Sequence, residues 1–489
     1  MSMKVRTLAV AVLCSGLAAC GTTVPMTQQT ALDPGPGLRA TDPGRTPAAA
    51  DQPTAGTPSR PSGAVAGTDP SRPVAAPSPG VAAPSATQAS LSPVEVGILT
   101  QGSSAEAGKA LGFNAADNGD ERAYAKIVID DVNRRGGLAG HRIIPVVYDI
   151  SSSQSQNVDD VLQAACAFFT QDHKVVAALL SWHGHSSSFY SCLEKRGVLI
   201  IDTNGIVTDE ASAFRQLPHL IAPNGIGLDR VARLLPPAAG RNWFGGEQVG
   251  VIAVDAPAYH RAVEQQLKPA LAAVGARFSS AVYTTPYKTA GDAASISSQL
   301  ANAVLRFRSQ GITRVVDLSG AVLVFATIAE TQQYRPRYAL TSASSPAALT
   351  ANGVPAVQLR GSVGLGWLPV YDSSEVPPAE LPRGQAACLQ LLRAHGQQPT
   401  GITVRYTALT FCEAGGFLHA LGTRAPAQQH LTGSSLLASL GAGLTHPSAM
   451  TFRSEVTPEQ RDGASAHRTF GFAEACGCFR YTGPLTSGR

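Results

Sequence analysis

From Val94 onward the chain alternates short apolar runs with longer amphipathic stretches, and this alternation restricts its fold more than any other feature. Alternating strands and helices place successive strands parallel in one sheet, with helices on both faces. The first set of predicted strands covers Val94–Leu99, Arg142–Tyr148, Val175–Leu179 and Val198–Asp202, separated by predicted helices at about Asn114–Arg134, Val158–Thr170 and Ser186–Arg196.

The same pattern starts again after a connecting region at about Pro218–Gly246. The second set of predicted strands is Val249–Val254, Ala281–Thr284, Arg314–Leu318 and Tyr338–Leu340, with helices at Tyr259–Val274, Ala293–Ser309 and Val322–Gln333. A further strand at Ser362–Leu365 and helices at about Gln385–Ala394 and Val404–Leu421 follow. A folded part of this length suits two lobes. We therefore expect an α/β protein whose folded part, 93–489, has lobe 1 at about 93–222 plus later returning segments, and lobe 2 at about 247–345.

The first twenty residues have the pattern of a lipoprotein signal peptide. Lys4 and Arg6 precede an apolar run at Leu8–Leu13, and Leu17-Ala18-Ala19-Cys20 has the form of a lipobox. The apolar run is shorter than the roughly 20 residues that a membrane-spanning helix needs. We expect Cys20 to be lipidated and to hold the mature protein on the extracytoplasmic face of the cell membrane. A secreted protein that is cleaved elsewhere is the alternative.

Residues 21–92 are dominated by Pro, Ala, Gly, Ser and Thr and contain almost no residues that could build a core. Such a composition predicts a disordered tether that its prolines keep extended. The formal net charge of the whole chain is +4, and no run of Lys or Arg concentrates it. Nucleic acid is therefore not an expected partner.

The chain has eight cysteines, of which six remain after Cys14 and Cys20 are set aside. An even number of cysteines in an exported chain favours disulfides. Six cysteines allow 15 connectivities. The nearest-neighbour pattern pairs Cys166 with Cys192, Cys388 with Cys412, and Cys476 with Cys478. A zinc site is the competing interpretation, but the Cys-Gly-Cys sequence lacks a second pair of ligands at a suitable spacing.

The opening of the folded part has a distinctive motif. A strand that reads VEVGILT is followed by a helix ending in N-R-R-G-G-L-A-G and a strand ending in Asp, which places the motif at Asn133, Gly136, Gly137, Leu138, Gly140 and Asp149. The motif resembles the start of the type I periplasmic binding proteins of branched-chain amino-acid and related ABC transporters. The resemblance continues through Cys166, Cys192 and the strand Val251–Asp255 with Tyr259 beyond it, and covers most of the chain from Pro93 to about Ser345.

This resemblance implies a lipid-anchored solute-binding protein that delivers a small polar metabolite, such as an amino acid, to an ABC permease. Parallel sheets bind small molecules beyond the carboxyl ends of their strands. That rule selects as ligand-binding candidates Gln101, Ser181, Trp182, His183, Ser186, Thr203, Asn204, Tyr259 and Ser319. The resemblance further implies that Ser181 or Ser186, together with Thr203, binds a carboxylate, and that Tyr259 contacts the ligand from the closing lobe.

One position departs from the family's amino-acid binders, which need a carboxylate facing the ligand's ammonium group. The loop after Tyr338–Leu340 reads Thr-Ser-Ala-Ser-Ser and contains no acid. A buried, unpaired ammonium group would cost several kcal/mol. Asp255 or Asp317 is the candidate substitute.

Enzyme motifs are scarce, so we expect no catalytic activity, no cofactor and no metal. The chain has no GxSxG, GxxxxGK[ST] or HExxH sequence. Two alternatives stay open. The first is a sensory module, in which the same closing lobes report a ligand to a membrane receptor. The second is a metal-dependent hydrolase that uses His183 and His185.

Overall fold

The computed structural model describes residues 91–101, 118–150, 157–181, 187–207, 210–289 and 291–488. The predicted signal peptide, Cys20 and nearly all of the predicted tether lie outside these ranges. Residues 85–489 belong to one compact unit, and this unit contains two large sheets, one entirely parallel and one mixed.

The first sheet is entirely parallel, with the strand order β2-β1-β3-β4-β6. Its register pairs Val94 with Ile143 and Thr100 with Asp149. Its strands are β1 (Val94–Thr100), β2 (Ile143–Asp149), β3 (Ala177–Leu180), β4 (Leu199–Asp202) and β6 (Leu220–Ile221). The helices between them are α2 (Glu121–Arg134), α3 (Val158–Ala167) with its π-helical end η2 (Phe168–Asp172), α4 (Ser187–Lys195) and α5 (Glu210–Gln216).

Alternating residues of these strands pack into separate cores on the two faces of the sheet. Val96 and Ile98 of β1 pack with α2, whereas Leu99 packs with α3 and α4. Gly97 lies against the ring of Phe169, and a Cβ at this position would be only 3.1 Å from the ring. Both faces are therefore apolar, which explains the continuous apolar sequence of β1.

The second sheet begins with five parallel strands and ends with antiparallel ones, in the order β9-β8-β10-β11-β12-β15-β16. Its strands are β8 (Gln248–Val254), β9 (Arg277–Thr284), β10 (Arg314–Asp317), β11 (Arg337–Thr341), β12 (Val363–Gly366), β15 (Ala466–Ala473) and β16 (Cys478–Tyr481), and β17 (Thr486–Ser487) pairs with β15. This sheet thus includes strands well beyond residue 345, because β15 returns to pair with β12.

Helices cover both faces of the second sheet. One face carries α6 (Leu228–Ala239) and the continuous helical segment α8 (Pro257–Ala262), η3 (Val263–Leu267) and α9 (Lys268–Ala273). The other carries α10 (Asp292–Ser309) and α11 (Val322–Thr331). The shorter elements are α7 (Arg241–Phe244), η4 (Ser342–Ser344), α12 (Pro346–Ala351), α13 (Ala356–Leu359), α14 (Pro369–Asp372) and η5 (Pro378–Glu380).

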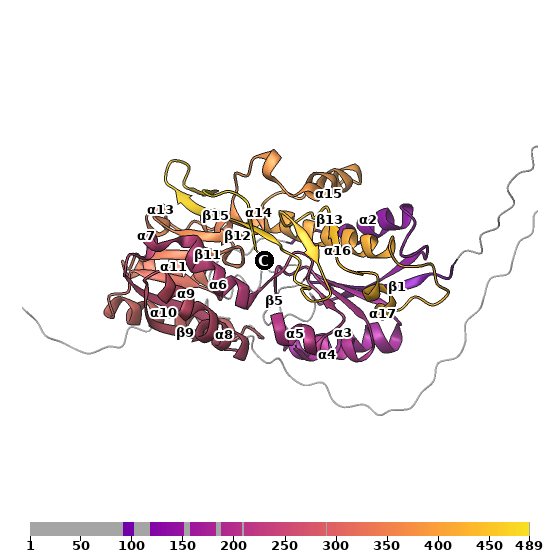
Figure 1. The fold of residues 1–489 in the computed structure, drawn as a ribbon, viewed down its shortest axis with the longest axis horizontal. Helices are drawn as coiled ribbons and strands as arrows, with labels where there is room; N and C mark the ends of the chain where they lie inside the picture. The colour runs from indigo at the N-terminus through magenta and orange to yellow at the C-terminus, as the bar shows by residue number, and fades with distance from the viewer. Residues whose placement is uncertain are drawn as a thin grey trace, which may run out of the picture. The chain divides into compact units, whose positions relative to one another are not determined.

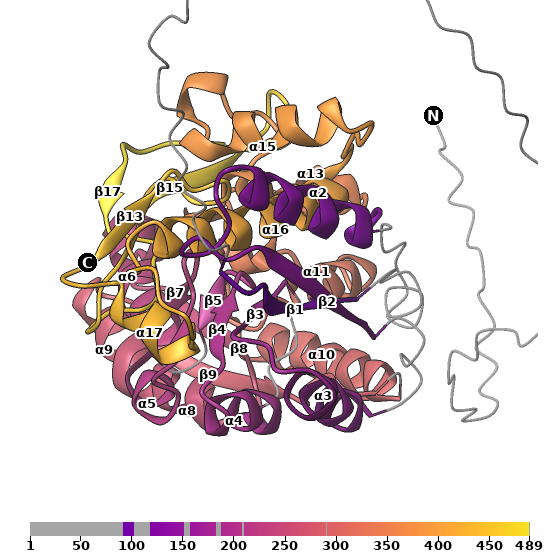
Figure 2. The same cartoon turned by 90° about the vertical axis from the view of Figure 1, so that its right-hand side faces the viewer.

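The segment after β12 returns to the first sheet. It includes α15 (Arg383–Ala394), the long α16 (Ile402–Gly422) and α17 (Gly433–Ala438). Both views place α2 and α16 side by side on one face of the first sheet, with α3 and α4 on the other (Figures 1 and 2). Gly415 makes the close contact of α16 with α2, because its Cα has no side chain beside Val128.

Two of the segments that cross between the lobes are hydrogen-bonded to each other. The first segment runs from β6 to β7 (Ile226–Gly227), and the second runs from β14 (Ser454–Val456) to β15. The strand β7 pairs with β5 (Ile206–Val207), and β14 pairs with β13 (Leu444–His446). Ala222 accepts from the N–H of Gly463 at 2.7 Å. Arg230 and Asp462 form a buried ion pair there, and Asp462 also accepts from the N–H of Gly227 at 2.7 Å.

The three nearest-neighbour cysteine pairs are the disulfides of the structure: Cys166–Cys192 joins α3 to α4, Cys388–Cys412 joins α15 to α16, and Cys476–Cys478 spans the turn from β15 to β16.

Candidate functional site

The strands of the first sheet deliver several predicted site residues to one edge. β1 and β3 end at Thr100 and Leu180, so Gln101 and Ser181 follow at the same edge, and both are half-buried. The backbone N–H of Gln101 donates to Oε2 of Glu121 at 2.6 Å. This bond ties the end of β1 to the buried first residue of α2.

Thr203 and Asn204 follow β4 at the same edge. Thr203 is completely buried, and its hydroxyl donates to the carbonyl of Leu180 at 3.1 Å. The side chain of Asn224, from a crossing segment, donates to the carbonyl of Thr203 at 2.9 Å. Thr203 therefore links the β3 and β4 ends to the connection between the lobes.

The last residue of β4, Asp202, is a buried acid that the sequence analysis did not select. Its carboxylate accepts from the Tyr190 hydroxyl and from the Asn204 N–H, both at 2.8 Å. Burial raises the pKa of Asp202 to about 7, although these two hydrogen bonds favour the charged form. This carboxyl group therefore titrates near neutral pH.

The second sheet presents a comparable acid, Asp317, at the end of β10. One oxygen of its fully buried carboxylate accepts from the hydroxyl and the N–H of Ser319, at 2.7 and 3.0 Å. The other oxygen accepts from the Ser344 hydroxyl at 2.8 Å. Burial raises the pKa of Asp317, and these bonds oppose the shift.

Tyr259 lies near Asp317. Burial and, as a smaller cause, the negative charge of Asp317 raise the pKa of the Tyr259 phenol to about 12. The phenol is therefore protonated at physiological pH, so it is a potential hydrogen-bond donor beside this carboxylate. Ser319 has a structural role already, because its hydroxyl also accepts from the N–H of Ala321.

Aromatic side chains connect the edges of the two sheets. The indole N–H of Trp367, which follows β12, donates to the carbonyl of Gly205 at 3.1 Å. The Tyr406 hydroxyl donates to the carbonyl of Asn204 at 3.0 Å, and the Tyr406 ring stacks on Tyr371 with centroids 3.9 Å apart. The loop after β4 thus meets the segment after β12. The strand-end rule, applied to the predicted strand Ser362–Leu365, would have selected Trp367.

A second contact joins the lobes farther along the same edges. Lys288, beyond the end of β9, forms an ion pair with Asp159 of α3 at 2.7 Å, and its carbonyl accepts from the N–H of Val158 at 3.2 Å. Loops at the carboxyl ends of both sheets therefore face each other, and the predicted residues Gln101, Ser181, Thr203, Asn204, Tyr259 and Ser319 all belong to these ends.

The candidate partners for a ligand ammonium group differ in their surroundings. Asp255 is exposed and accepts from His260 at 2.8 Å, whereas Asp317 is buried and bonded to two serines. Asp202 adds a third carboxylate in the opposite lobe. An ammonium ligand at either buried acid would have to share the carboxylate with these existing hydrogen bonds.

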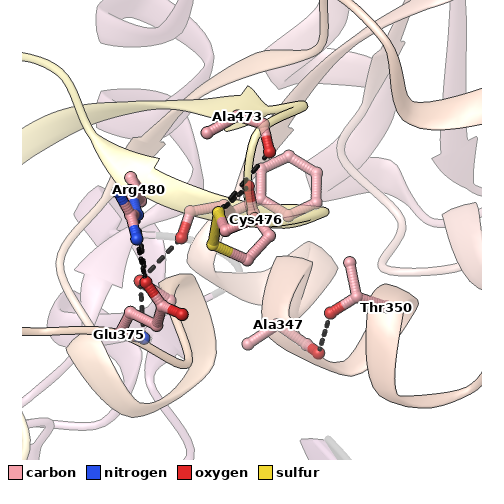
Figure 3. The surroundings of a disulfide bond; sticks show 9 residues. Ala347, Thr350, Glu375, Ala473, Cys476 and Arg480 are labelled. Atoms are coloured by element: carbon pink, nitrogen blue, oxygen red, sulfur yellow. Dashed lines mark hydrogen bonds and ion pairs between the residues drawn. A yellow bond between two sulfur atoms is a disulfide. The ribbon is translucent and has the colours of Figure 1, made fainter. Parts of the chain in front are cut away.

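Trp182, His183 and Ser186 lie outside the described residues, as does His185 of the alternative metal site. Within the described part of the chain, one group of three side chains has the spacing of metal ligands: Glu375, Cys476 and Cys478. Figure 3 shows that the two sulfurs form a disulfide and that Glu375 forms an ion pair with Arg480. A disulfide supplies no thiolate ligands, so this group does not fit a metal in its oxidised form.

None of the helices within the described ranges combines the length and the apolar character needed to cross a bilayer.

The comparisons with known proteins identify the fold. No family model matches the sequence, and no curated protein matches it. Among solved structures, a solute-binding protein of an ABC transporter from Rhodopseudomonas palustris BisB5, in complex with 3,4-dihydroxybenzoic acid, is 13% identical. That match covers 81% of this chain and 97% of the other, with a TM-score of 0.58.

Two further solved structures are named for, or bound to, other kinds of ligand. The branched-chain amino acid transporter substrate-binding protein LivJ from Streptococcus pneumoniae, with isoleucine, is 12% identical, covering 80% of this chain and all of the other at a TM-score of 0.54. A fatty acid ABC transporter substrate-binding protein from Thermomonospora curvata is 14% identical, covering 81% and 92% at a TM-score of 0.53. The chain therefore has the two-lobed fold of type I periplasmic binding proteins, as the sequence motif predicted.

Proposed function

We propose that this chain is an extracytoplasmic solute-binding protein that captures a small polar metabolite between its lobes and delivers it to an ABC permease. The observation that carries the proposal is that the carboxyl ends of the two sheets meet through Trp367, Tyr406 and Lys288. A ligand favours the closed form only if it touches both lobes. The candidates Thr203 and Asn204 on one side, and Tyr259 and Ser319 on the other, would allow this.

The fold leaves the ligand class open, because solved structures with the same fold carry names or ligands as different as dihydroxybenzoate, isoleucine and fatty acid. An amino acid or a related compound is our proposal. Its carboxylate would be bound by Ser181 or Ser186 with Thr203, and Asp202 or Asp317 would have to receive its ammonium group.

Ligand capture is tested by thermal-shift measurements against amino acids, small carboxylates, amides, nucleosides and sugars. A ligand that binds only the native state stabilises it by about 2.7 kcal/mol at a hundred times its Kd, and so raises the melting temperature. We expect one chemical class to do so, and Tyr259→Phe with Thr203→Val to abolish the shift. Thr327→Val is the matched control, because Thr327 is exposed on α11.

The outcomes separate the remaining functions. Binding without any association with a permease in detergent-solubilised membranes would favour the receptor role over transport. No shift with any small molecule, together with near-stoichiometric zinc in protein purified without added metal, would favour the hydrolase at His183 and His185.

We further propose that Cys20 carries the lipid that anchors the protein. Labelled fatty acid should enter the full-length chain but not Cys20→Ser, and this variant should leave the membrane fraction. Membrane retention of Cys20→Ser would contradict the anchor.

A further inference from the structure

Three polar side chains form a hydrogen-bonded chain on the first lobe, away from the edge where the lobes meet. Nδ1 of His219 lies 2.6 Å from Oε1 of Glu194, and Nε2 of His219 lies 2.8 Å from the Ser434 hydroxyl. The backbone N–H of His219 also donates to the other oxygen of Glu194, at 2.9 Å. The three residues come from the end of α4, the turn before β6 and the start of α17.

The geometry fixes the role of each group. The carboxylate accepts hydrogen bonds only, so in the neutral imidazole Nδ1 is the donor to Glu194 and Nε2 presents its lone pair to the serine hydroxyl. This is the arrangement by which a serine is activated as a nucleophile in hydrolases on several unrelated folds. Glu194 and His219 are largely shielded, with side-chain exposures of 14% and 15%, whereas Ser434 is exposed to solvent.

The backbone around Ser434 is held firmly. Thr432 and Ser435 form a reciprocal capping box, with hydrogen bonds of 3.0 and 3.1 Å. Gly433 packs so closely on the first sheet that a Cβ would be 2.2 Å from the carbonyl oxygen of Gly197. A fixed backbone keeps the Ser434 hydroxyl in register with His219.

A cavity of about 290 Å³ adjoins these residues. Thr432 and Gly433, which directly precede Ser434, line it, and so does Arg196, two residues after Glu194. Lys174 adds a second positive charge. Val176 and Val198 place the cavity at the amino ends of β3 and β4, opposite the edge where the lobes meet. Ser434 is exposed directly after the lining residues Thr432 and Gly433, so a small molecule can reach it without entering the space between the lobes.

We propose that Ser434, His219 and Glu194 form a second, hydrolytic site that cleaves small carboxylic esters bearing a negative charge. Oγ of Ser434 bonds to the ester carbonyl carbon while Nε2 of His219 takes the hydroxyl proton. The carbon–oxygen bond to the alcohol breaks, and the alcohol leaves with that proton. Water then attacks the acyl group by the same path, which releases the acid and restores Ser434. Glu194 is a positioning residue, and Lys174 and Arg196 attract the anionic substrate.

The first experiment treats the full chain with a fluorophosphonate, which forms an Oγ–phosphorus bond and releases fluoride. Peptide mapping should find the adduct on Ser434. His219→Gln should slow labelling on the order of 100-fold, which is the usual contribution of a general base. Ser439→Ala is the matched control, since Ser439 directly follows α17 and its hydroxyl donates to the carbonyl of Ser435 in that helix. It should leave labelling unchanged.

The pH profile tests Glu194. Glu194→Gln should change the pH profile of Ser434 labelling as well as its rate. The groups that face the pair are the Ser434 hydroxyl and Arg461, whose guanidinium interacts with Glu194. A purely structural role for Glu194 would alter the melting temperature and leave the profile unchanged.

The second experiment compares hydrolysis of 4-nitrophenyl succinate with that of 4-nitrophenyl butyrate, which is similar in size but uncharged. We expect a higher kcat/KM for the succinate ester, and Lys174→Ala should reduce the preference. Equal rates would overturn the anionic substrate class. The hydrolytic site would be overturned if Ser434 is labelled no faster than the other exposed serines of the chain, in protein with an unchanged melting temperature. The three residues would then serve only to anchor α17.

Discussion

Two adjacent glycines in α16 provide a sharp test of the packing between α16 and α2. A Cβ at Gly415 would lie 2.2 Å from Cγ1 of Val128, whereas a Cβ at Gly416 would have no neighbour within 4 Å. Both glycines are inside the helix, so replacement by alanine gains the same propensity at each, about 1 kcal/mol. Only Gly415→Ala also introduces a steric overlap, which costs roughly 1 to 3 kcal/mol.

We therefore expect Gly416→Ala to raise the free energy of unfolding by about 1 kcal/mol. Gly415→Ala should be less stable than Gly416→Ala by roughly 1 to 3 kcal/mol, because the propensity gain cancels in the comparison. Urea unfolding followed by circular dichroism measures both values. Val128→Ala removes the clashing methyl group, so the difference should shrink in that background. Equal stabilities of the two variants, or a difference that survives Val128→Ala, would refute the packing described for α16.

Three other predictions concern buried polar groups. Asp202 has a pKa of about 7 in the fold and about 3.9 when unfolded, so its contribution to stability is complete below pH 4 and is lost as the pH rises through 7. Asp202→Asn should remove this fall of about 3 to 4 kcal/mol between pH 4 and 8. The unfolding free energy would be measured by denaturant titration at several pH values, and the same pH dependence in both proteins would contradict the prediction. Asp462→Asn leaves Arg230 without its ion-pair partner and should cost about 3 to 5 kcal/mol, whereas replacing both by apolar residues should cost less; calorimetry that finds the reverse order would refute this. Trp367→Phe leaves the carbonyl of Gly205 without its indole donor and should lower the unfolding free energy by about 1 to 3 kcal/mol, so an unchanged urea midpoint would count against that contact.

The sequence predicted the α/β elements well where the pattern is local. β1 begins at Val94 as expected, and α4 and α16 lie within one or two residues of their predicted bounds. The predicted helix Tyr259–Val274 contains a π-helical turn at Val263–Leu267, where the N–H of Lys268 donates to Val263. Pro269, which follows directly, has no N–H to donate, so the regular pattern of hydrogen bonds is interrupted there.

Long-range pairing explains what the sequence analysis missed. β15 pairs with β12 across about a hundred residues, and no local periodicity encodes such a partner. The same holds for Glu194, His219 and Ser434, whose spacing matches no motif. For the candidate site between the lobes, the strand-end rule selected residues at the carboxyl ends of both sheets. It could not foresee the bonds from other segments, such as those of Asn224 to the Thr203 carbonyl and of Ser344 to Asp317.

The placement of the disulfides has a consequence for how a protein exported as we propose would acquire its structure. Cys166–Cys192 and Cys388–Cys412 staple helices of the first lobe, and Cys476–Cys478 closes one turn of the second, so none of the three bridges the lobes. Each pair is separated by 26 residues or fewer, and short loops close with the smallest entropic cost. A chain that emerges unfolded into an oxidising compartment can therefore reach the native connectivity by local collisions, with little need for an isomerase to correct the 14 wrong arrangements among 15. Oxidation therefore stiffens each lobe separately and adds no disulfide between them.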